Sequence, residues 1–251
     1  GSDRISGLMQ RLGMEEGVPI EHGMVTRAIE RAQKQVEAQN FAVRKHLLEY
    51  DDVMNKQRES VYTLRREVLD GTVRVTEDET SDTRGYLLAT ADDLVDDKVE
   101  LYCPKDGDHS TWDLDALRRE LTELFSLDDD DYAVVPFDDR PAEIREALSA
   151  RVRAKYEAKE AVIPPDIMRR VERDLMLQIV DTQWKDHLYS LDHLKDGISL
   201  RSYGQRDPLV EYKKESYVLF QDMRSRIEAE MVRYLWWLRP VEGGPDGDQP
   251  I

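Results

Sequence analysis

The feature that most constrains the fold is an uninterrupted helical pattern from Met24 to Leu69, which lies ahead of the turn signal Asp70-Gly71. Its apolar residues recur every three or four positions, apart from polar residues at Gln39 and Gln57, and it contains no proline or glycine. This period of about 3.5 residues predicts one helix with a continuous packing seam, roughly 65 to 70 Å long and too long for a small core. The seam residues are Val25, Ile29, Ala32, Val36, Val43, Leu47, Tyr50, Met54, Val61, Leu64 and Val68.

Composition excludes several classes of protein. The net charge of -17 and the pI near 4.8 argue against a nucleic-acid partner, which requires clustered cations. The single Cys103 excludes an internal disulfide framework and a Cys-rich zinc site, and indicates a reducing compartment. No stretch approaches the about 18 to 20 apolar residues of a membrane span, and the first residues do not form a signal peptide, so we expect a soluble or peripheral protein. Gly1-Ser2 and the missing initiator Met lead us to expect a piece of a longer protein.

The regions that flank the long helix differ in composition. Residues 1–23 suggest a short helix and a loop, and residues 239–251 read as a flexible linker. Residues 71–165 carry 25 Asp and Glu against 12 Lys and Arg, a net charge of -13. We expect this insert to be mostly helical, with helices over 83–101, 113–125 and from Pro141 onward, and a short extended piece over 133–137.

Two acidic groups within the insert are predicted to be solvated. The first is an acidic helix face formed by Asp92, Asp93, Asp96 and Asp97. The second is the run from Asp128 to Asp131, which lacks the glycine and the distal glutamate of a calcium-binding loop.

Two further helices follow Pro164-Pro165. The first is expected from Ile167 to about Leu194, capped by Asp166, and the second from Pro208 to about Leu238, capped by Asp207. The loop between them, residues 197–206, makes them an antiparallel hairpin. Near its end, the Trp236-Trp237 pair is expected to pack against the long helix rather than to contact a membrane interface.

No catalytic or cofactor-binding constellation stands out. The chain has no Walker-type phosphate loop, no HExxH motif and no metal-ligand spacing of Cys and His. His187 and His193 are six positions apart on a helix and therefore point to different faces, which argues against a shared metal site. We predict no catalytic, cofactor-binding or metal-binding residues in this chain.

The loop at the hairpin tip carries the candidate functional residues Tyr203, Leu200, Arg201, Gln205 and Arg206. The loop contains an aromatic ring, two cations and flexible glycines at positions where the sequence pattern predicts no buried core. The loop is either an ordinary long connection or a contact surface, in which Tyr203 offers an apolar ring with a polar end.

Several motifs resemble the SecA family, the ATP-driven motors of bacterial preprotein export. The segments Val25-Thr-Arg-Ala-Ile-Glu-Arg-Ala-Gln33 and Leu47-Leu-Glu-Tyr-Asp-Asp-Val-Met-Asn-Lys-Gln-Arg58 resemble its long scaffold helix. Trp184-Lys-Asp-His-Leu188, Gly197-Ile-Ser-Leu-Arg-Ser-Tyr-Gly-Gln-Arg-Asp-Pro208 and Glu211-Tyr-Lys-Lys-Glu-Ser216 resemble its two-helix finger. The insert corresponds to the family's helical wing mainly by position and helical character.

The resemblance implies an all-α fold in which a very long scaffold helix, residues 24–70, packs against an antiparallel helical hairpin, with a mostly helical wing inserted at 71–165. Residues 1–23 would end the preceding nucleotide-binding domain, and 166–238 would continue the scaffold with the finger at about 179–221. Tyr203, at the family's tip position, would contact the moving polypeptide, and Arg201 and Arg206 would support contacts to the polypeptide or the channel.

The resemblance also implies partners and a location. The partners are an unfolded preprotein, the SecY translocon channel, the nucleotide-binding and preprotein-binding domains of the parent, and a homodimer of the parent. The location is the bacterial cytoplasm and the cytoplasmic face of the cell membrane. ATP and Mg belong to domains of the parent outside this sequence, so this piece is expected to lack ATPase activity.

Two other classes of function compete with this interpretation. A non-motor helical adaptor would pair the seam of the long helix with another chain as a coiled coil. An enzyme that uses acidic residues of the insert has only their abundance in its favour, because catalytic carboxylates need a defined separation and environment.

Overall fold

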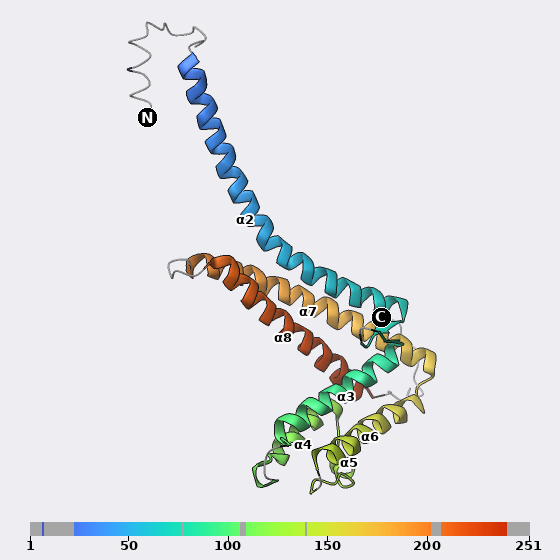
Figure 1. The fold of residues 1–251 in the computed structure, drawn as a ribbon. Helices are drawn as coiled ribbons and strands as arrows, with labels where there is room; N and C mark the ends of the chain where they lie inside the picture. The colour runs from blue at the N-terminus through green and yellow to red at the C-terminus, as the bar shows by residue number, and fades with distance from the viewer. Residues whose placement is uncertain are drawn as a thin grey trace, which may run out of the picture. The chain divides into compact units, whose positions relative to one another are not determined.

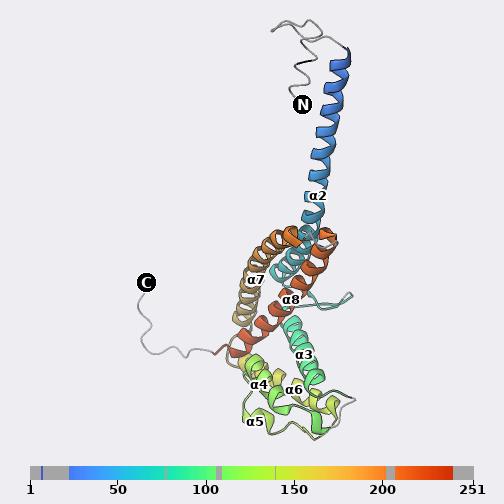
Figure 2. The same cartoon turned by 90° about the vertical axis from the view of Figure 1, so that its left-hand side faces the viewer.

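A computed structural model describes Gly7 and residues 23–76, 78–105, 109–138, 140–201 and 207–239, without the side chains of residues 24 and 199–201. The contacts divide the chain into two units, Gly1–Asp52 and Val53–Ile251. Each unit is described by itself (Figures 1 and 2).

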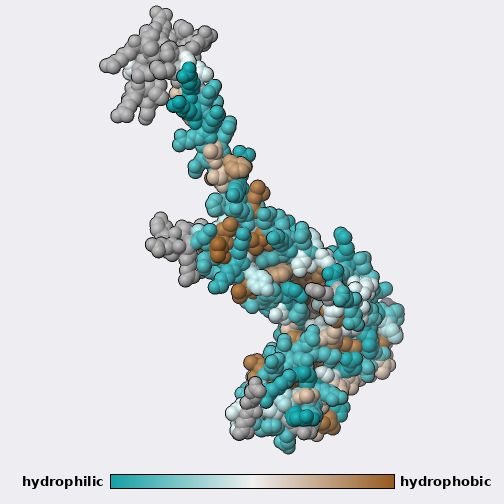
Figure 3. All heavy atoms as spheres, in the orientation of Figure 1, coloured by the Kyte–Doolittle hydropathy of each residue, from teal (hydrophilic) through white to brown (hydrophobic). Residues whose placement is uncertain are grey.

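The described part of the first unit is the beginning of the long helix α2, which spans Gly23–Asp70. Local pairs such as Lys45 with Glu49, one turn apart, support it on the surface. Its apolar side chains are half to two-thirds exposed, and Figure 3 shows brown patches interrupting the hydrophilic surface of the helix. These side chains are Ile29, Val36, Phe41, Val43, Leu47 and Leu48.

The second unit is helical apart from one small hairpin of strands among the residues that the structure describes. After α2, a turn at Gly71, whose φ is 72°, leads into antiparallel β1 (Val73–Arg74) and β2 (Thr80–Ser81). The helices that follow are α3 (Thr83–Tyr102), the short 3-10 helix η1 (His109–Thr111), α4 (Leu114–Phe125), α5 (Asp129–Tyr132), α6 (Pro141–Glu160), α7 (Pro165–Arg201) and α8 (Pro208–Trp237). The predicted all-α class is therefore confirmed.

Helices α3 to α6, which we call the wing helices, begin at local signals, which are aspartate caps for α3, α4 and α5 and a first-turn proline for α6. Asp82 accepts a hydrogen bond from the Gly85 amide, and Asp113 accepts one from Ala116, so each satisfies a free amide in the first turn. Pro141 is the first residue of α6. Apolar side chains of α3, α4 and α6 then meet in one core, and both views show these helices clustered together (Figure 2).

Three local features of this unit differ from the sequence predictions. Residues 133–137 form turns rather than an extended piece, and the small β1–β2 hairpin was not predicted. Asp166 lies in the first turn of α7 and does not cap it, because Pro165 already starts the helix and the carbonyl of Pro164 accepts from Met168.

The acidic groups of the wing helices are paired more than predicted. Asp92 and Asp96 on α3 bond Arg153 and Arg145 of α6, at 2.9 and 2.7 Å. The run that begins at Asp128 forms α5, whose capping box joins Asp128 and Asp131, and both carboxylates accept from Lys155. Asp92 and Asp96 therefore pair with α6, whereas Asp93, Asp97 and residues 128–130 are exposed to solvent, as predicted.

Helices α7 and α8 form the predicted antiparallel hairpin, and the two helices run side by side in both views (Figures 1 and 2). Asp207 caps α8 through the Leu209 amide, and Pro208 is its first residue, as predicted. However, α7 extends to Arg201 rather than ending near Leu194. Burial of Ile198, which continues the apolar face beyond Leu191, outweighs the roughly 1 kcal/mol that Gly197 costs within a helix.

The tryptophan pair at the end of α8 lies against the wing helices, so the predicted packing on the long helix was wrong. Trp236 is 2% exposed, its ring contacts Phe125 and Tyr156, and its indole nitrogen donates to the carbonyl of Val152 at 3.0 Å. Trp237 is 46% exposed, although its indole nitrogen donates to the Glu123 carbonyl at 2.8 Å.

This contrast predicts that Trp236→Ala lowers the free energy of unfolding by about 3–5 kcal/mol, because it opens a large cavity and removes a buried hydrogen bond. Trp237→Ala removes a half-exposed ring and one hydrogen bond, so it should cost about 1 kcal/mol. Urea unfolding followed by circular dichroism measures both. Equal losses for the two variants would contradict the placement of Trp236 in the core.

Candidate functional site

The predicted tip residues fall at the edge of the described structure. Tyr203, Gln205 and Arg206 lie outside the described residues. Leu200 and Arg201 belong to α7 by their backbone, and their side chains lie outside the description. Their contact role therefore stays a prediction, and the described part of the site is the hairpin that carries them.

The hairpin is held together by a row of buried side chains that runs from its base toward its tip. On α7 these are Trp184, His187, Leu191 and Ile198, and on α8 they are Tyr212, Ser216, Phe220 and Met223. Its outer surface exposes other rings, Tyr189 at 68% and Tyr217 at 61%. The hairpin is thus a packed rod that can hold its tip at a distance from its base.

Polar contacts attach the hairpin to the final turns of α2. The Gln57 side chain bonds His187 of α7 and the carbonyl of Ser216 on α8, and Arg65 pairs with Asp181 of α7 at 2.9 Å. Burial lowers the pKa of His187 to about 4, and the charge of Arg226 acts in the same direction, so the imidazole is neutral.

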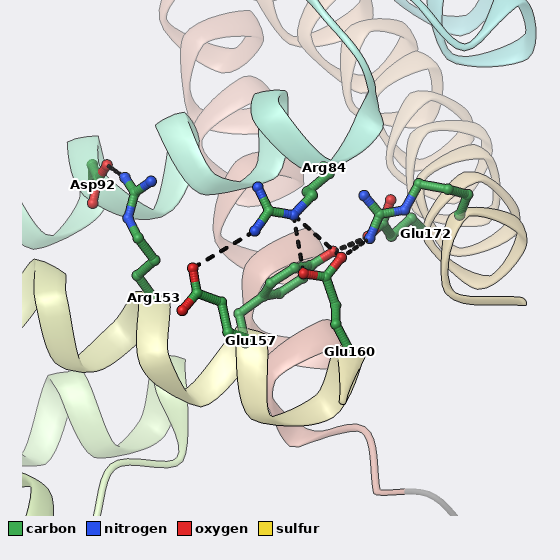
Figure 4. A network of polar contacts seen from close by, with 8 residues as sticks. Arg84, Asp92, Arg153, Glu157, Glu160 and Glu172 are labelled. Carbon is green, nitrogen blue, oxygen red and sulfur yellow. Dashed lines mark hydrogen bonds and ion pairs between the residues drawn. The ribbon is translucent and has the colours of Figure 1, made fainter. Parts of the chain in front are cut away.

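At the base of the hairpin, a polar network joins α7 to the wing helices (Figure 4). Its centre is Glu172 of α7, whose side chain is completely buried. Its carboxylate accepts hydrogen bonds from Thr83 of α3 at 2.7 Å and from the hydroxyl of Tyr156 on α6, and it pairs with Arg169 at 2.8 Å. Burial raises the pKa of this carboxyl, while these three partners favour its charged form.

The same network continues across the wing side. Arg169 also bonds Glu160 at the end of α6, and Arg84 of α3 donates to Glu160 at 3.0 Å. Glu157 lies 3.8 Å from Arg84 (Figure 4). The network therefore spans the start of α3, the end of α6 and the start of α7, where the chain enters and leaves the wing helices. We call it the wing joint.

The end of α8 is tied to the same place. The ammonium of Lys159 on α6 donates to the carbonyl of Leu235 at 2.7 Å and to that of Trp236, both in the last turn of α8. Burial lowers the pKa of Lys159 to about 8, and neighbouring Lys155 and Arg239 add to the effect. The start of α7 and the end of α8, which together form the base of the hairpin, are thus both fixed to α6.

A groove of about 770 Å³ lies between the C-terminal turns of α2 and the two helices α3 and α8. Its walls include apolar residues such as Leu64 and Met223 together with the carboxylates of Asp93 and Glu228. Burial raises the pKa of both carboxyls. Repulsion from Asp96, Asp97 and Asp92 adds to the rise at Asp93, and repulsion from Asp93 and Asp97 adds to it at Glu228, where Arg224 partly opposes it. Asp93 and Asp97 thus face this groove, whereas their sequence neighbours Asp92 and Asp96 pair with arginines of α6.

Other kinds of site find no support in the described part of the chain. Within it, no group of three or more His, Cys, Asp and Glu could hold a metal ion. No described helix combines the length and the apolar character needed to span a bilayer. His187 and His193 diverge, since His187 lies in the core beside Phe220 and His193 lies against Tyr189.

Sequence reasoning did not identify the wing joint or the bonds of Gln57. A signal for the joint was present, because Glu172 lies four residues from both Met168 and Met176, which are fully buried. A carboxylate on the apolar face of a helix indicates partners from neighbouring helices. Gln57 was visible as a polar residue in the seam, but its partners are distant in the sequence.

Comparison with known proteins gives consistent matches. Residues 19–239 match the family model described as the SecA Wing and Scaffold domain. The chain is similar to "Protein translocase subunit SecA" of Solibacter usitatus, with 44% identity over 257 residues that cover 99% of this chain and 25% of that protein. The protein of the same name from Geobacter metallireducens is 45% identical over 239 residues, covering 95% of this chain and 26% of the relative.

The chain therefore spans about a quarter of the length of the curated relatives it matches. The match includes the long helix, the wing helices and the hairpin described above. By this match over most of its length, the chain belongs to the SecA wing and scaffold domain family.

Proposed function

We propose that this chain is the non-catalytic scaffold, wing and finger part of a SecA-like motor that drives unfolded preproteins through the SecY translocon. ATP bound with Mg would be hydrolysed by domains outside this sequence. The motor would work in the bacterial cytoplasm and on the cytoplasmic face of the cell membrane. The names of the relatives, all translocase subunits, support this proposal.

The observation that carries the proposal is the α7–α8 hairpin. Its two helices are packed along their length, its base is fixed to α6, and its predicted tip carries Tyr203 with Arg201 and Arg206. A packed hairpin that is fixed at its base and attached to α2 through Gln57 can transmit displacement of its base to its tip, where Tyr203 would contact the polypeptide. Arg201 and Arg206 would support that contact or one to the channel.

The exposed apolar residues of α2 within the first unit support a scaffold role. Ile29, Val36, Val43 and Leu47 are each about half exposed along one seam. Such a stripe is typical of a helix that packs on another partner. We assign it to the nucleotide-binding and preprotein-binding domains of the parent.

The same stripe favours the rival function, a coiled-coil adaptor. Sedimentation separates the two functions, because an adaptor would be an obligate dimer that loses structure on dilution. A monomer is expected for the scaffold, although the parent itself could form a homodimer through other surfaces.

The first test of the motor proposal uses Tyr203→Ala in the intact translocase. Polypeptide transport should fall several-fold, while basal ATP hydrolysis changes less than twofold, because the tip acts on the polypeptide and not on nucleotide. Tyr62→Ala, which removes a ring that is 55% exposed on α2, is the control. Transport by the Tyr203 variant at the wild-type rate in reconstituted vesicles would refute the proposed tip contact.

A second test concerns nucleotide. We expect this chain alone to neither bind nor hydrolyse ATP, because the phosphate-binding motifs would lie in other domains of the parent. Calorimetric titration with Mg and ATP should give only heats of dilution. Saturable heat, or phosphate release above a buffer blank, would contradict the non-catalytic assignment.

A third test concerns the wing joint, which we assign to holding the wing helices on the scaffold. Arg169→Met should lower the free energy of unfolding by about 3–5 kcal/mol, because it leaves the buried Glu172 carboxylate without its cation. Arg153→Met removes a pair whose two side chains are 48% and 37% exposed, and should cost less than about 1 kcal/mol. Urea unfolding measures both, and similar losses would contradict the special role of the joint.

A further inference from the structure

The side chain of Gln57 contacts both helices of the hairpin at once. Its amide nitrogen donates to the backbone carbonyl of Ser216 on α8 at 3.1 Å. Its amide oxygen lies 2.8 Å from the Nε2 of His187 on α7. One residue of α2 therefore connects two helices that are far apart in the sequence, and we call these three residues the glutamine clamp.

The contact with Ser216 fixes the orientation of the Gln57 amide, and this orientation decides which atom donates in the hydrogen bond with His187. Because a carbonyl can only accept, the Gln57 amide nitrogen must face Ser216, which leaves the amide oxygen facing His187. That oxygen accepts, so the imidazole must carry its proton on Nε2. A slide or rotation of either hairpin helix along α2 would break at least one of these bonds.

The clamp lies in the core, where broken bonds are costly. Gln57 is 8% exposed, His187 is 1% exposed and Ser216 is 0% exposed. The imidazole contacts the rings of Trp184 and Phe220, with centroid distances of 5.6 and 5.7 Å. Water cannot readily replace a lost partner here, so a shifted hairpin would leave buried polar groups unsatisfied.

Other attachments of this part of α2 to the hairpin are less directional. The pair of Arg65 and Asp181 is on the surface, where both side chains are 40% or more exposed and the contact adds little. Val61 and Val68 are buried, but apolar contacts tolerate small slides. On the side that faces α3, the groove described above lies between α2 and α8.

We propose that Gln57 is a positioning residue that, through His187 and Ser216, fixes the register and rotation of the hairpin on α2, so that displacement of the long helix reaches the hairpin tip. This inference rests on the proposed motor function. A polar residue within an apolar seam is a known way to select one register among several of similar packing energy.

The test measures coupling in the full-length translocase. Gln57→Leu keeps the volume and removes both hydrogen bonds, and it should raise the ATP consumed per polypeptide transported by threefold or more. His187→Phe should give a similar rise, and the double variant no more than either single one, because the bonds act as a unit. His187→Gln, which retains a donor near the Nε2 position, should restore most of the coupling.

A matched control and a structural readout complete the experiment. Gln221→Leu makes the same chemical change on the exposed face of α8 and should leave coupling at the wild-type value. In this chain, nitrogen-15 NMR should show His187 as a neutral imidazole with its proton on Nε2 at pH 6. In the Gln57→Leu variant, the proton should no longer be confined to Nε2.

Three results would overturn the inference: unchanged coupling in Gln57→Leu, an additive double variant, or an Nδ1-protonated imidazole. Tyr203→Ala in the same assay separates the two proposals. If Tyr203→Ala impairs transport while Gln57→Leu does not alter coupling, the clamp inference fails and the motor proposal stands. If neither variant has an effect, the motor proposal itself fails.

Discussion

The constraint on which this structure depends is the excess of apolar seam on α2. A helix of 48 residues carries more apolar side chains along one face than its own chain covers. Val61 and Val68 enter the core of the second unit, whereas Ile29, Val36 and Val43 of the first unit remain about half exposed. Further surfaces that cover the exposed part would lower the free energy of α2, and this is the physical basis of the scaffold role proposed above.

Apolar seams alone specify contact but not position, because the hydrophobic effect is non-directional. Within the second unit, direction comes from a few polar groups placed inside those seams. Glu172 accepts from Thr83 and Tyr156, and Gln57 contacts both helices of the hairpin. Because each such group has a high desolvation penalty, it is stable only when its partners are all in place. A small number of buried polar residues thus fixes where the wing helices and the hairpin lie.

Sequence reasoning succeeded where the determinants were local. Apolar period, the Asp207 cap and the first-turn prolines predicted α2, α4, α6 and α8, and a helix was also expected at α3, because such signals act within a few residues. It failed where distant residues decide the outcome. Gly197 suggested a loop, but burial of Ile198 extended the helix, and the acidic face of α3 was divided by arginines of α6 that lie about 50 to 60 residues away.

The candidate site shows the same division. The tip residues were recognised in the sequence because they are residues that the core does not use, as a contact surface for a partner requires. Their role came from the family resemblance. The residues that hold the hairpin could not be derived in this way, since Gln57 and His187 are 130 positions apart. They become recognisable only when the fold brings them together.

The arrangement of these polar groups has a mechanical consequence. Lys159 binds the C-terminal carbonyls of α8, Glu172 binds α7 to the wing helices, and Gln57 binds the middle of the hairpin to α2. The hairpin is therefore held at two places along its length, its base and its middle. A rod that is held at two points has its direction determined, whereas a rod held at one point can pivot. In the proposed motor, displacement of either support would change the direction of the hairpin and so reach its tip.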